Sequence, residues 1–172
     1  MKLKIPFLPS KPSVGVIKMS GVISAGARGG LSDQVLSPVL EKAFKKGHHK
    51  AVALLINSPG GSPVQSSLIS SRIKRLAKEN DMPVYAFVED VAASGGYWLA
   101  CSADEIYADT GSIIGSIGVI SAGFGFQELI HKYGVERRVY TAGKSKSMLD
   151  PFKKENPEDI KRLKKILGEM HE

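Results

Sequence analysis

A continuous apolar run, KAVALLI at residues 50–56, constrains the fold of this chain more than any other stretch of its sequence. Such a run is typical of a strand that is covered on both faces, as in parallel sheets flanked by helices. A helix with one apolar face is predicted before it, over residues 32–46, and another is predicted after it, from Ser62. This order predicts an α/β fold built from repeated strand and helix units.

The same alternation continues along the rest of the chain. Strands are predicted over 14–24 (one strand or a strand pair), 83–89, 104–109 and 136–141, and helices near Ser94, over 124–133 and from Asn156. The helix from Ser62 has a strong start signal: the serine can cap it, a proline suits its first position and Gln65 can complete a capping box. Such alternation implies mostly parallel strands, and sites in these folds form where strands end and helices begin.

Size and composition limit the classes of protein to which the chain can belong. With 172 residues, 42% of them hydrophobic and 24% charged, we predict an extension at residues 1–13 and a single domain over residues 14–172. The single cysteine excludes an internal disulfide. No signal peptide or transmembrane segment is recognisable, so a cytoplasmic or peripherally membrane-associated location is expected. No cofactor and no metal site are predicted.

The net charge of +7 comes largely from lysines in the stretches 42–50 and 144–165. No aromatic residues are interleaved with these lysines as stacking platforms, so nucleic acid is not a predicted partner. A solvated basic surface is the simplest interpretation. Contact with an acidic membrane surface is the better of the functional alternatives.

The first candidate site residues lie in NSPGGS, residues 57–62, between the apolar strand and the helix from Ser62. Two glycines before a helix start allow the backbone N–H groups of Gly60 and Gly61 to point outward, where they can bind a developing oxyanion. The alternative is an ordinary turn with good helix punctuation.

The second candidate is Ser94, within Ala92-Ala93-Ser94-Gly95-Gly96. A serine at a helix start is usually a cap. However, small residues on both sides would also expose its hydroxyl to a substrate, with the N–H of Gly95 placed for an oxyanion. The order strand, turn, serine and helix follows the logic of a nucleophile elbow, although the usual GxSxG spacing is absent.

The third candidate is the stretch 110–119, TGSIIGSIGV, where glycines and serines alternate with apolar residues. It can line a groove and offer backbone to an extended peptide, with Ser116, Ile117 and Gly118 as groove residues. The alternative is a glycine-rich strand with a bulge.

A nucleophilic serine needs a base. None of the four histidines is well placed, since His48 and His49 lie in a turn, His171 at the chain end and His131 on a helix among charged neighbours. Lysine is the remaining base, and Lys144 and Lys146 stand among small residues before an apolar stretch. Burial against apolar groups disfavours the charged form of a lysine and lets it act as a neutral base. A solvated surface charge is the simpler interpretation of either lysine.

Four motifs in this order, NSPGGS, VAASGGYWLA, TGSIIGSIGV and AGKSKSMLDPF, resemble bacterial signal peptide peptidase A and its relatives. The resemblance runs from about Val14 to the end of the chain. It implies a fold like that of Clp protease and the crotonases, and a serine-lysine peptidase that cleaves signal-peptide remnants or other extended apolar peptides. It also implies a homo-oligomer, because relatives form rings whose sites can draw serine and lysine from neighbouring chains.

The resemblance also assigns the site. Ser94 matches the family nucleophile, and Lys146 matches the general base because it immediately precedes the serine of the pattern K-S-x-x-x-P-F. Lys144 falls where the family varies. Gly95 and the pair Gly60 and Gly61 would supply the oxyanion donors, with Gly61 preferred within the pair.

Two departures from the family pattern bear on activity. Relatives usually carry an N-terminal membrane anchor and usually continue beyond the lysine motif, so a shortened or inactive assembly module is one alternative to the peptidase. A crotonase-like acyl-CoA enzyme that uses the same oxyanion glycines is the other. It is disfavoured because such enzymes do not need the serine-lysine pair.

Overall fold

The structure is a computed structural model that describes residues 12–26, 30–45, 49–143 and 145–172. It forms two compact units, Met1–Ile117 and Gly118–Glu172, and each is described here by itself. The sequence-based prediction of a single domain over residues 14–172, with an extension at 1–13, stays a prediction.

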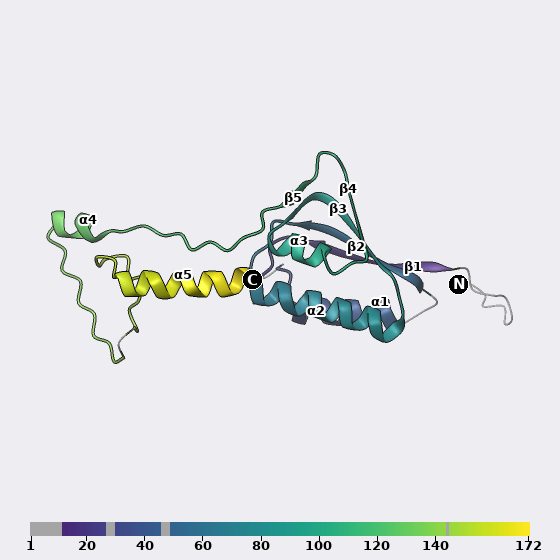
Figure 1. Cartoon of the computed structure of the whole chain (residues 1–172), viewed down its shortest axis with the longest axis horizontal. Coiled ribbons are helices and arrows are strands. Elements are labelled where there is room, and N and C mark those ends of the chain that lie inside the picture. The colour runs from purple at the N-terminus through teal and green to yellow at the C-terminus, as the bar shows by residue number, and fades with distance from the viewer. Residues whose placement is uncertain (1–11, 27–29, 46–48, 144) are drawn as a thin grey trace, which may run out of the picture. The chain divides into compact units, whose positions relative to one another are not determined.

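A parallel sheet forms the centre of the first unit. Its strands are β1 (Ser13–Ser20), β2 (His49–Ser58), β3 (Val84–Ala93), β4 (Glu105–Ala108) and β5 (Ile113–Gly115). The first four lie in the order β1-β2-β3-β4, and β5 pairs with the end of β3. All of these pairings are parallel, as Figure 1 shows for the strands of the first unit. The predicted α/β class is therefore confirmed, and the sheet is consistent with a Clp protease- and crotonase-like fold.

Helices α1 (Asp33–Lys45) and α2 (Pro63–Asn80) lie on one side of this sheet (Figure 1), and a short helix, α3 (Gly95–Ala100), follows β3. Alternate residues of the strands pack against them, because side chains alternate between the two faces of a strand. The resulting core contains Ile17, Met19, Leu36, Leu40, Val52, Leu54, Ile56, Ile69, Ile73, Leu76, Val84, Ala86 and Leu99. The apolar run at residues 50–56 is thus the buried strand that the sequence predicts.

The opposite face of the sheet is covered less evenly than the sequence predicts. Ala51 and Ala53 of the central strand β2 are buried, but Val16 on the edge strand β1 is 60% exposed. Phe87 and Tyr107 of β3 and β4 stack with ring centroids 5.2 Å apart and are both exposed. Coverage on both faces therefore holds for β2 but not for the edge strands β1 and β4, nor for Phe87 of β3.

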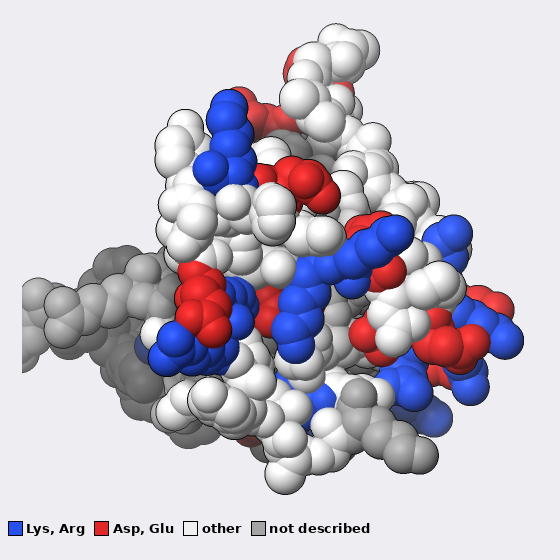
Figure 2. Space-filling model, turned by 90° about the vertical axis from the view of Figure 1, so that its left-hand side faces the viewer, with Lys and Arg blue, Asp and Glu red and all other residues white. Residues whose placement is uncertain are grey.

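Charged side chains of both signs are interspersed on the surface. On the face shown in Figure 2, lysines and arginines lie beside aspartates and glutamates. Exposed ion pairs such as Lys18 with Glu89, at 3.7 Å, and Lys165 with Glu169, at 3.6 Å, are part of this pattern. Within the described residues, every helix is too short or too polar to cross a membrane.

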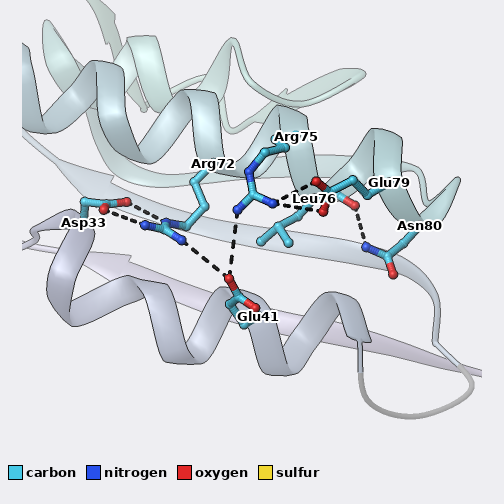
Figure 3. Close-up of polar contacts among 7 residues, drawn as sticks. All are labelled: Asp33, Glu41, Arg72, Arg75, Leu76, Glu79 and Asn80. Atoms are coloured by element: carbon cyan, nitrogen blue, oxygen red, sulfur yellow. Dashed lines mark hydrogen bonds and ion pairs between the residues drawn. The ribbon is translucent and has the colours of Figure 1, made fainter.

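A polar network joins α1 to α2 (Figure 3). Both carboxylate oxygens of Asp33 accept hydrogen bonds from the Arg72 guanidinium, each at 2.7 Å. Glu41 lies 3.5 Å from Arg72 and 3.9 Å from Arg75, and Arg75 also pairs with Glu79. The hydrogen bond from Arg72 is the main reason that the pKa of Asp33 lies below its usual range.

The start of α2 follows the prediction only in part. Ser62 is the N-cap, and its hydroxyl accepts a hydrogen bond from the Gln65 N–H at 3.4 Å. The other half of the predicted capping box is wrong, because the Gln65 side chain accepts the Asp33 N–H at 2.9 Å, and the Ser62 N–H donates to Ile23. The glutamine therefore links α2 to the start of α1 instead of closing its own helix.

The second unit contains α4 (Gln127–Lys132) and α5 (Pro157–His171), and neither helix has a buried residue. The last helix starts where predicted, and Asn156 caps it by accepting the Glu158 N–H at 2.9 Å. The predicted strand over 136–141 is wrong, since these residues form no regular secondary structure.

An aromatic and ionic cluster holds part of this unit together. Phe126 and Phe152 lie 5.6 Å apart, and the Arg137 guanidinium stacks 4.7 Å from the Phe152 ring. Arg137 also pairs with Asp150 at 3.0 Å, and the Asp150 side chain is only 4% exposed. The hydrogen bond from the Phe152 N–H, followed by Arg137, lowers the pKa of Asp150.

Candidate active site

Ser94 occupies a sharp turn between β3 and α3. The strand ends at Ala93, the helix begins at Gly95, and Ser94 has φ 50° and ψ −119°. A positive φ is costly for a residue with a side chain, by about 1–3 kcal/mol, and persists only where the surrounding structure imposes it. The Ser94 hydroxyl makes no capping hydrogen bond. The predicted position at the start of a helix after a strand is confirmed, and the capping role is excluded.

The glycine loop packs directly against this turn. Gly60 has φ 94°, and a Cβ on it would lie 2.7 Å from both the Ala93 oxygen and the Gly95 nitrogen, and 2.9 Å from the Ser94 Cβ. Real Cβ atoms essentially never come so close to a backbone. Only glycine fits this position, and its absent side chain is what allows the ends of β2 and β3 to meet.

Two further glycines allow the serine turn to sit deep in the unit. A Cβ on Gly95 would collide with the Ser66 hydroxyl, and a Cβ on Gly96 would collide with the Ser58 carbonyl oxygen. Ser58 and Ser66 are themselves fully buried. The turn is thus enclosed by backbone and small side chains, which explains the local sequence of small residues around Ser94.

The backbone N–H groups beside Ser94 differ in their hydrogen bonding. The Gly60 N–H donates to the Ser58 hydroxyl at 3.2 Å, whereas the Gly61 and Gly95 N–H groups have no acceptor within the described part of the first unit. Donors without an internal acceptor are what an oxyanion site requires. Of the predicted glycine pair, Gly61 is therefore better suited than Gly60 to this role.

The third predicted stretch also reaches Ser94. Strand β5 pairs with Val91–Ala93 at the end of β3, and the Ser94 N–H donates to the Gly115 oxygen at 2.7 Å. Ser116, with φ 53°, and Ile117, which is 69% exposed, follow directly. Two of the three predicted groove residues therefore lie next to the serine turn, while Gly118 begins the second unit.

Lys146 lies in a turn over residues 145–149 of the second unit and is exposed. The burial against apolar groups that sequence reasoning requires of a neutral lysine is not formed around it. Ser94 belongs to the first unit and Lys146 to the second, so their pairing stays a prediction. Lys144 lies outside the described residues.

The described histidines, which are the alternative candidates for a general base, lie on β2, α4 and α5. His49 pairs with the Ser13 hydroxyl at 2.9 Å at the start of β2, His131 is exposed on α4, and His171 ends α5. His48 lies outside the described residues. Among the residues that are described, no group of three or more histidine, cysteine or acidic side chains could hold a metal ion.

Ser58 is the residue that sequence reasoning missed. It belongs to the NSPGGS motif, and its hydroxyl accepts a hydrogen bond from the loop that faces Ser94. A signal was present, because Ser58 continues the alternation of Val52, Leu54 and Ile56 and so falls on the buried face of β2.

Comparison with known proteins identifies a family whose model matches this chain. Residues 76–172 match the model of peptidase family S49. The chain is 53% identical over 176 residues to a Brucella melitensis protein named Na(+)/H(+) antiporter NhaA, a match that covers 99% of this chain and 24% of that protein. It is 34% identical over 159 residues to the chloroplastic serine protease SPPA of Arabidopsis thaliana, covering 86% of this chain and 23% of that one.

The chain therefore spans about a quarter of the length of each of these two relatives. Among solved structures, a mutant of the 1510-N membrane-bound stomatin-specific protease aligns with a TM-score of 0.49 and 20% identity, over 67% of this chain and 51% of that one.

Proposed function

Because this chain belongs to peptidase family S49, we propose that it is a serine endopeptidase in which Ser94 is the nucleophile and Lys146 the general base. The observation that carries the proposal is the Ser94 turn. Its hydroxyl is not used as a helix cap, its backbone is held at a positive φ, and two N–H groups beside it have no acceptor among the described residues of the first unit.

In this reaction, the Ser94 oxygen attacks the carbonyl carbon of the scissile peptide bond while its proton passes to the amine of Lys146. The negative charge that forms on the carbonyl oxygen is stabilised by the N–H groups of Gly61 and Gly95. The resulting ammonium then protonates the departing amine, which leaves an acyl ester on Ser94. Water hydrolyses this ester: Lys146 takes a proton from the attacking water and passes it to the departing Ser94 oxygen, which restores both residues.

The proposed substrates are extended apolar peptides, such as the remnants of signal peptides. Strand β5 ends beside the nucleophile, and its apolar residues Ile113 and Ile114 are exposed. An extended peptide can add to the backbone of such an edge and place alternate side chains in apolar contacts. Ser116, Ile117 and Gly118 are the proposed groove residues.

The proposed partner, besides the peptide, is a second copy of the chain. Lys146 is exposed, and α5 presents apolar residues such as Met170, which is 47% exposed. A neighbouring copy would cover these apolar residues and desolvate the lysine, which the general-base role requires. Peripheral contact with an acidic membrane surface is a further proposal, supported only by the net charge of +7.

An alkyl fluorophosphonate tests the proposal, because it reacts with activated serines. We expect labelling at Ser94, found by mass spectrometry of the digested protein, and none in Ser94→Ala. We also expect cleavage of peptides with apolar or small residues around the scissile bond. Turnover of an acyl-CoA thioester without labelling would instead support a crotonase-like enzyme. Self-association without labelling or turnover would support a non-catalytic module.

A further inference from the structure

A fully buried hydroxyl lies beneath the glycine loop of the candidate active site. Ser58, the last residue of β2, is 0% exposed. Its hydroxyl donates to the Gly21 oxygen at 2.7 Å and accepts the Gly60 N–H at 3.2 Å. A buried hydroxyl is costly unless it is hydrogen-bonded, and this one has both a donor and an acceptor partner.

The position of Ser58 is one where an apolar side chain would be expected. Val52, Leu54 and Ile56 precede it on the same face of β2, and all three are buried in the core. Replacing an apolar residue by serine gives up buried apolar surface, so packing alone gives no reason for a hydroxyl here. The reason for a hydroxyl at this position is its two hydrogen bonds, both to backbone groups of neighbouring loops.

These bonds fix the direction of the peptide groups in the glycine loop. The Ser58 hydroxyl turns the Gly60 N–H inward. The Gly60 oxygen accepts the Ile23 N–H at 2.8 Å, and the Ser62 N–H donates to the Ile23 oxygen at 2.8 Å. Gly60 and Ser62 thus bond Ile23 as in a parallel bridge, with Gly61 between them. In this geometry the N–H of the middle residue points to the other side of its own segment, so the Gly61 N–H is directed away from Ile23.

We propose that Ser58 is a positioning residue of the active site. By holding the Gly60 N–H inward, its hydroxyl keeps the Gly61 N–H directed at the carbonyl oxygen of a substrate bound at Ser94. Ser58 does not touch the substrate and acts only through the glycine loop. This inference rests on the proposed function, in which Gly61 is an oxyanion donor.

The test uses the full chain in its native assembly and compares Ser58→Ala with Ser102→Ala. Ser102 is a matched control, because it is also buried and its hydroxyl also donates to a backbone oxygen, that of Leu99 at 2.5 Å. The kinetics of alkyl fluorophosphonate labelling give a maximal rate and a half-saturating probe concentration. Amide hydrogen exchange, followed by NMR, reports on the Gly60 N–H independently of activity.

For Ser58→Ala we expect the maximal labelling rate to fall about 10- to 100-fold, less than the roughly 10²- to 10³-fold cost of deleting an oxyanion donor outright. The half-saturating concentration should stay the same, because substrate contacts are unchanged. Exchange of the Gly60 amide should quicken about 2- to 10-fold, as expected for one lost hydrogen bond. Ser102→Ala should leave the maximal labelling rate, the half-saturating concentration and the exchange of the Gly60 amide unchanged.

The outcomes separate this inference from the proposed function. An unlabelled wild-type protein would overturn both. A labelled wild type with an unchanged maximal rate in Ser58→Ala would overturn the positioning role alone, as would equal losses in Ser58→Ala and Ser102→Ala. If Ser58→Ala does not fold, Ser58→Cys takes its place, since a thiol has the same shape at a slightly larger size but is a much weaker acceptor. Its maximal rate should also fall, and an unchanged rate would again overturn the role.

Discussion

The surroundings of Ser94 and those of Lys146 are built in different ways. Around the serine, backbone segments and the Ser66 side chain approach so closely that Gly60, Gly61, Gly95 and Gly96 leave no room for a Cβ. In the unit that carries the lysine, α4 and α5 have no buried residues, and a Cβ on Gly143 would meet nothing within 4 Å. The nucleophile is therefore preorganised by its own unit, whereas the environment of the proposed base has to come from further contacts.

The largest expected effect comes from the lysine. Lys146→Ala should abolish labelling of Ser94 and peptide cleavage while leaving the fold intact, as measured by circular dichroism. Lys146→Arg should be equally inactive, because a guanidinium stays protonated and cannot act as a base. Lys144→Ala is the control and should keep most of the activity. If the Lys146→Ala protein were active, Lys146 would not be the general base.

Mixing two inactive variants tests whether the serine and the lysine of one active site come from the same chain. If a second copy completes the site, Ser94→Ala chains supply the lysine and Lys146→Ala chains supply the serine. Mixed assemblies, formed by dissociation and reassociation, should then regain labelling, and only on the Lys146→Ala chain. Mixtures that stay unlabelled would mean that serine and lysine pair within one chain, contrary to the expectation from the exposed Lys146.

Matched glycine substitutions test the packing difference between the two units. Gly60 and Gly143 both have positive φ, 94° and 97°, but only the first is in contact with other backbone. Gly60→Ala should lower the free energy of unfolding by roughly 2–4 kcal/mol, from backbone strain and overpacking. Gly143→Ala should cost about 1 kcal/mol, from strain alone. Urea denaturation measures both, and equal costs would contradict the comparison.

The ion network on the serine unit gives a smaller, pH-dependent effect. The pKa of Asp33 is lowered in the folded state by Arg72, so its contribution is present above the unfolded value of about 3.9 and is lost as the pH falls through the lower folded value. Asp33→Asn should cost about 1–2 kcal/mol at neutral pH, because it breaks a partly buried charged hydrogen bond.

The control for this prediction is Glu79→Gln, which removes an exposed i,i+4 pair with Arg75 and should cost at most about 0.5 kcal/mol. Unfolding free energies are measured from pH 7 to pH 2. The difference between wild type and Asp33→Asn should shrink below pH 4. A difference that persists at pH 2 would show that the cost arises from something other than the ionised carboxylate.

Local signals made much of the fold predictable. The apolar run of β2 and the Ser62-Pro63 start of α2 depend on neighbouring residues only, and both elements are as predicted. The strand predicted at 83–89 extends to Ala93, because its last residues pair with β5, a partner distant in sequence. The strand predicted at 136–141 does not form; its Tyr140 is 90% exposed, and alternation alone cannot supply a neighbouring strand.

The candidate site was predictable to a similar extent. Small residues around Ser94 indicated an exposed hydroxyl at a strand end; the turn is there, and Ser94 in it is half-buried. The contact of Gly60 with that turn, and the hydrogen bond from Gly60 to Ser58, could not be read from the sequence, because they depend on the parallel register of β2 and β3. The exposure of Lys146 agrees with the simpler interpretation of a solvated surface charge, whereas the burial that a neutral base needs could not be read from the sequence, since burial is a property of the whole fold.

The smallest expected effect is that of His131→Ala. His131 is exposed on α4, in the same unit as Lys146, and is the remaining candidate for a base if lysine is not used. Loss of an exposed side chain on a short surface helix should change stability by no more than about 0.5 kcal/mol. The labelling rate of Ser94 and its dependence on pH should match those of the wild type, measured between pH 6 and pH 10. A labelling rate that falls as steeply as in Lys146→Ala would assign the base to His131. In that case the second unit would still supply the base, but the serine would be activated by an imidazole instead of an amine.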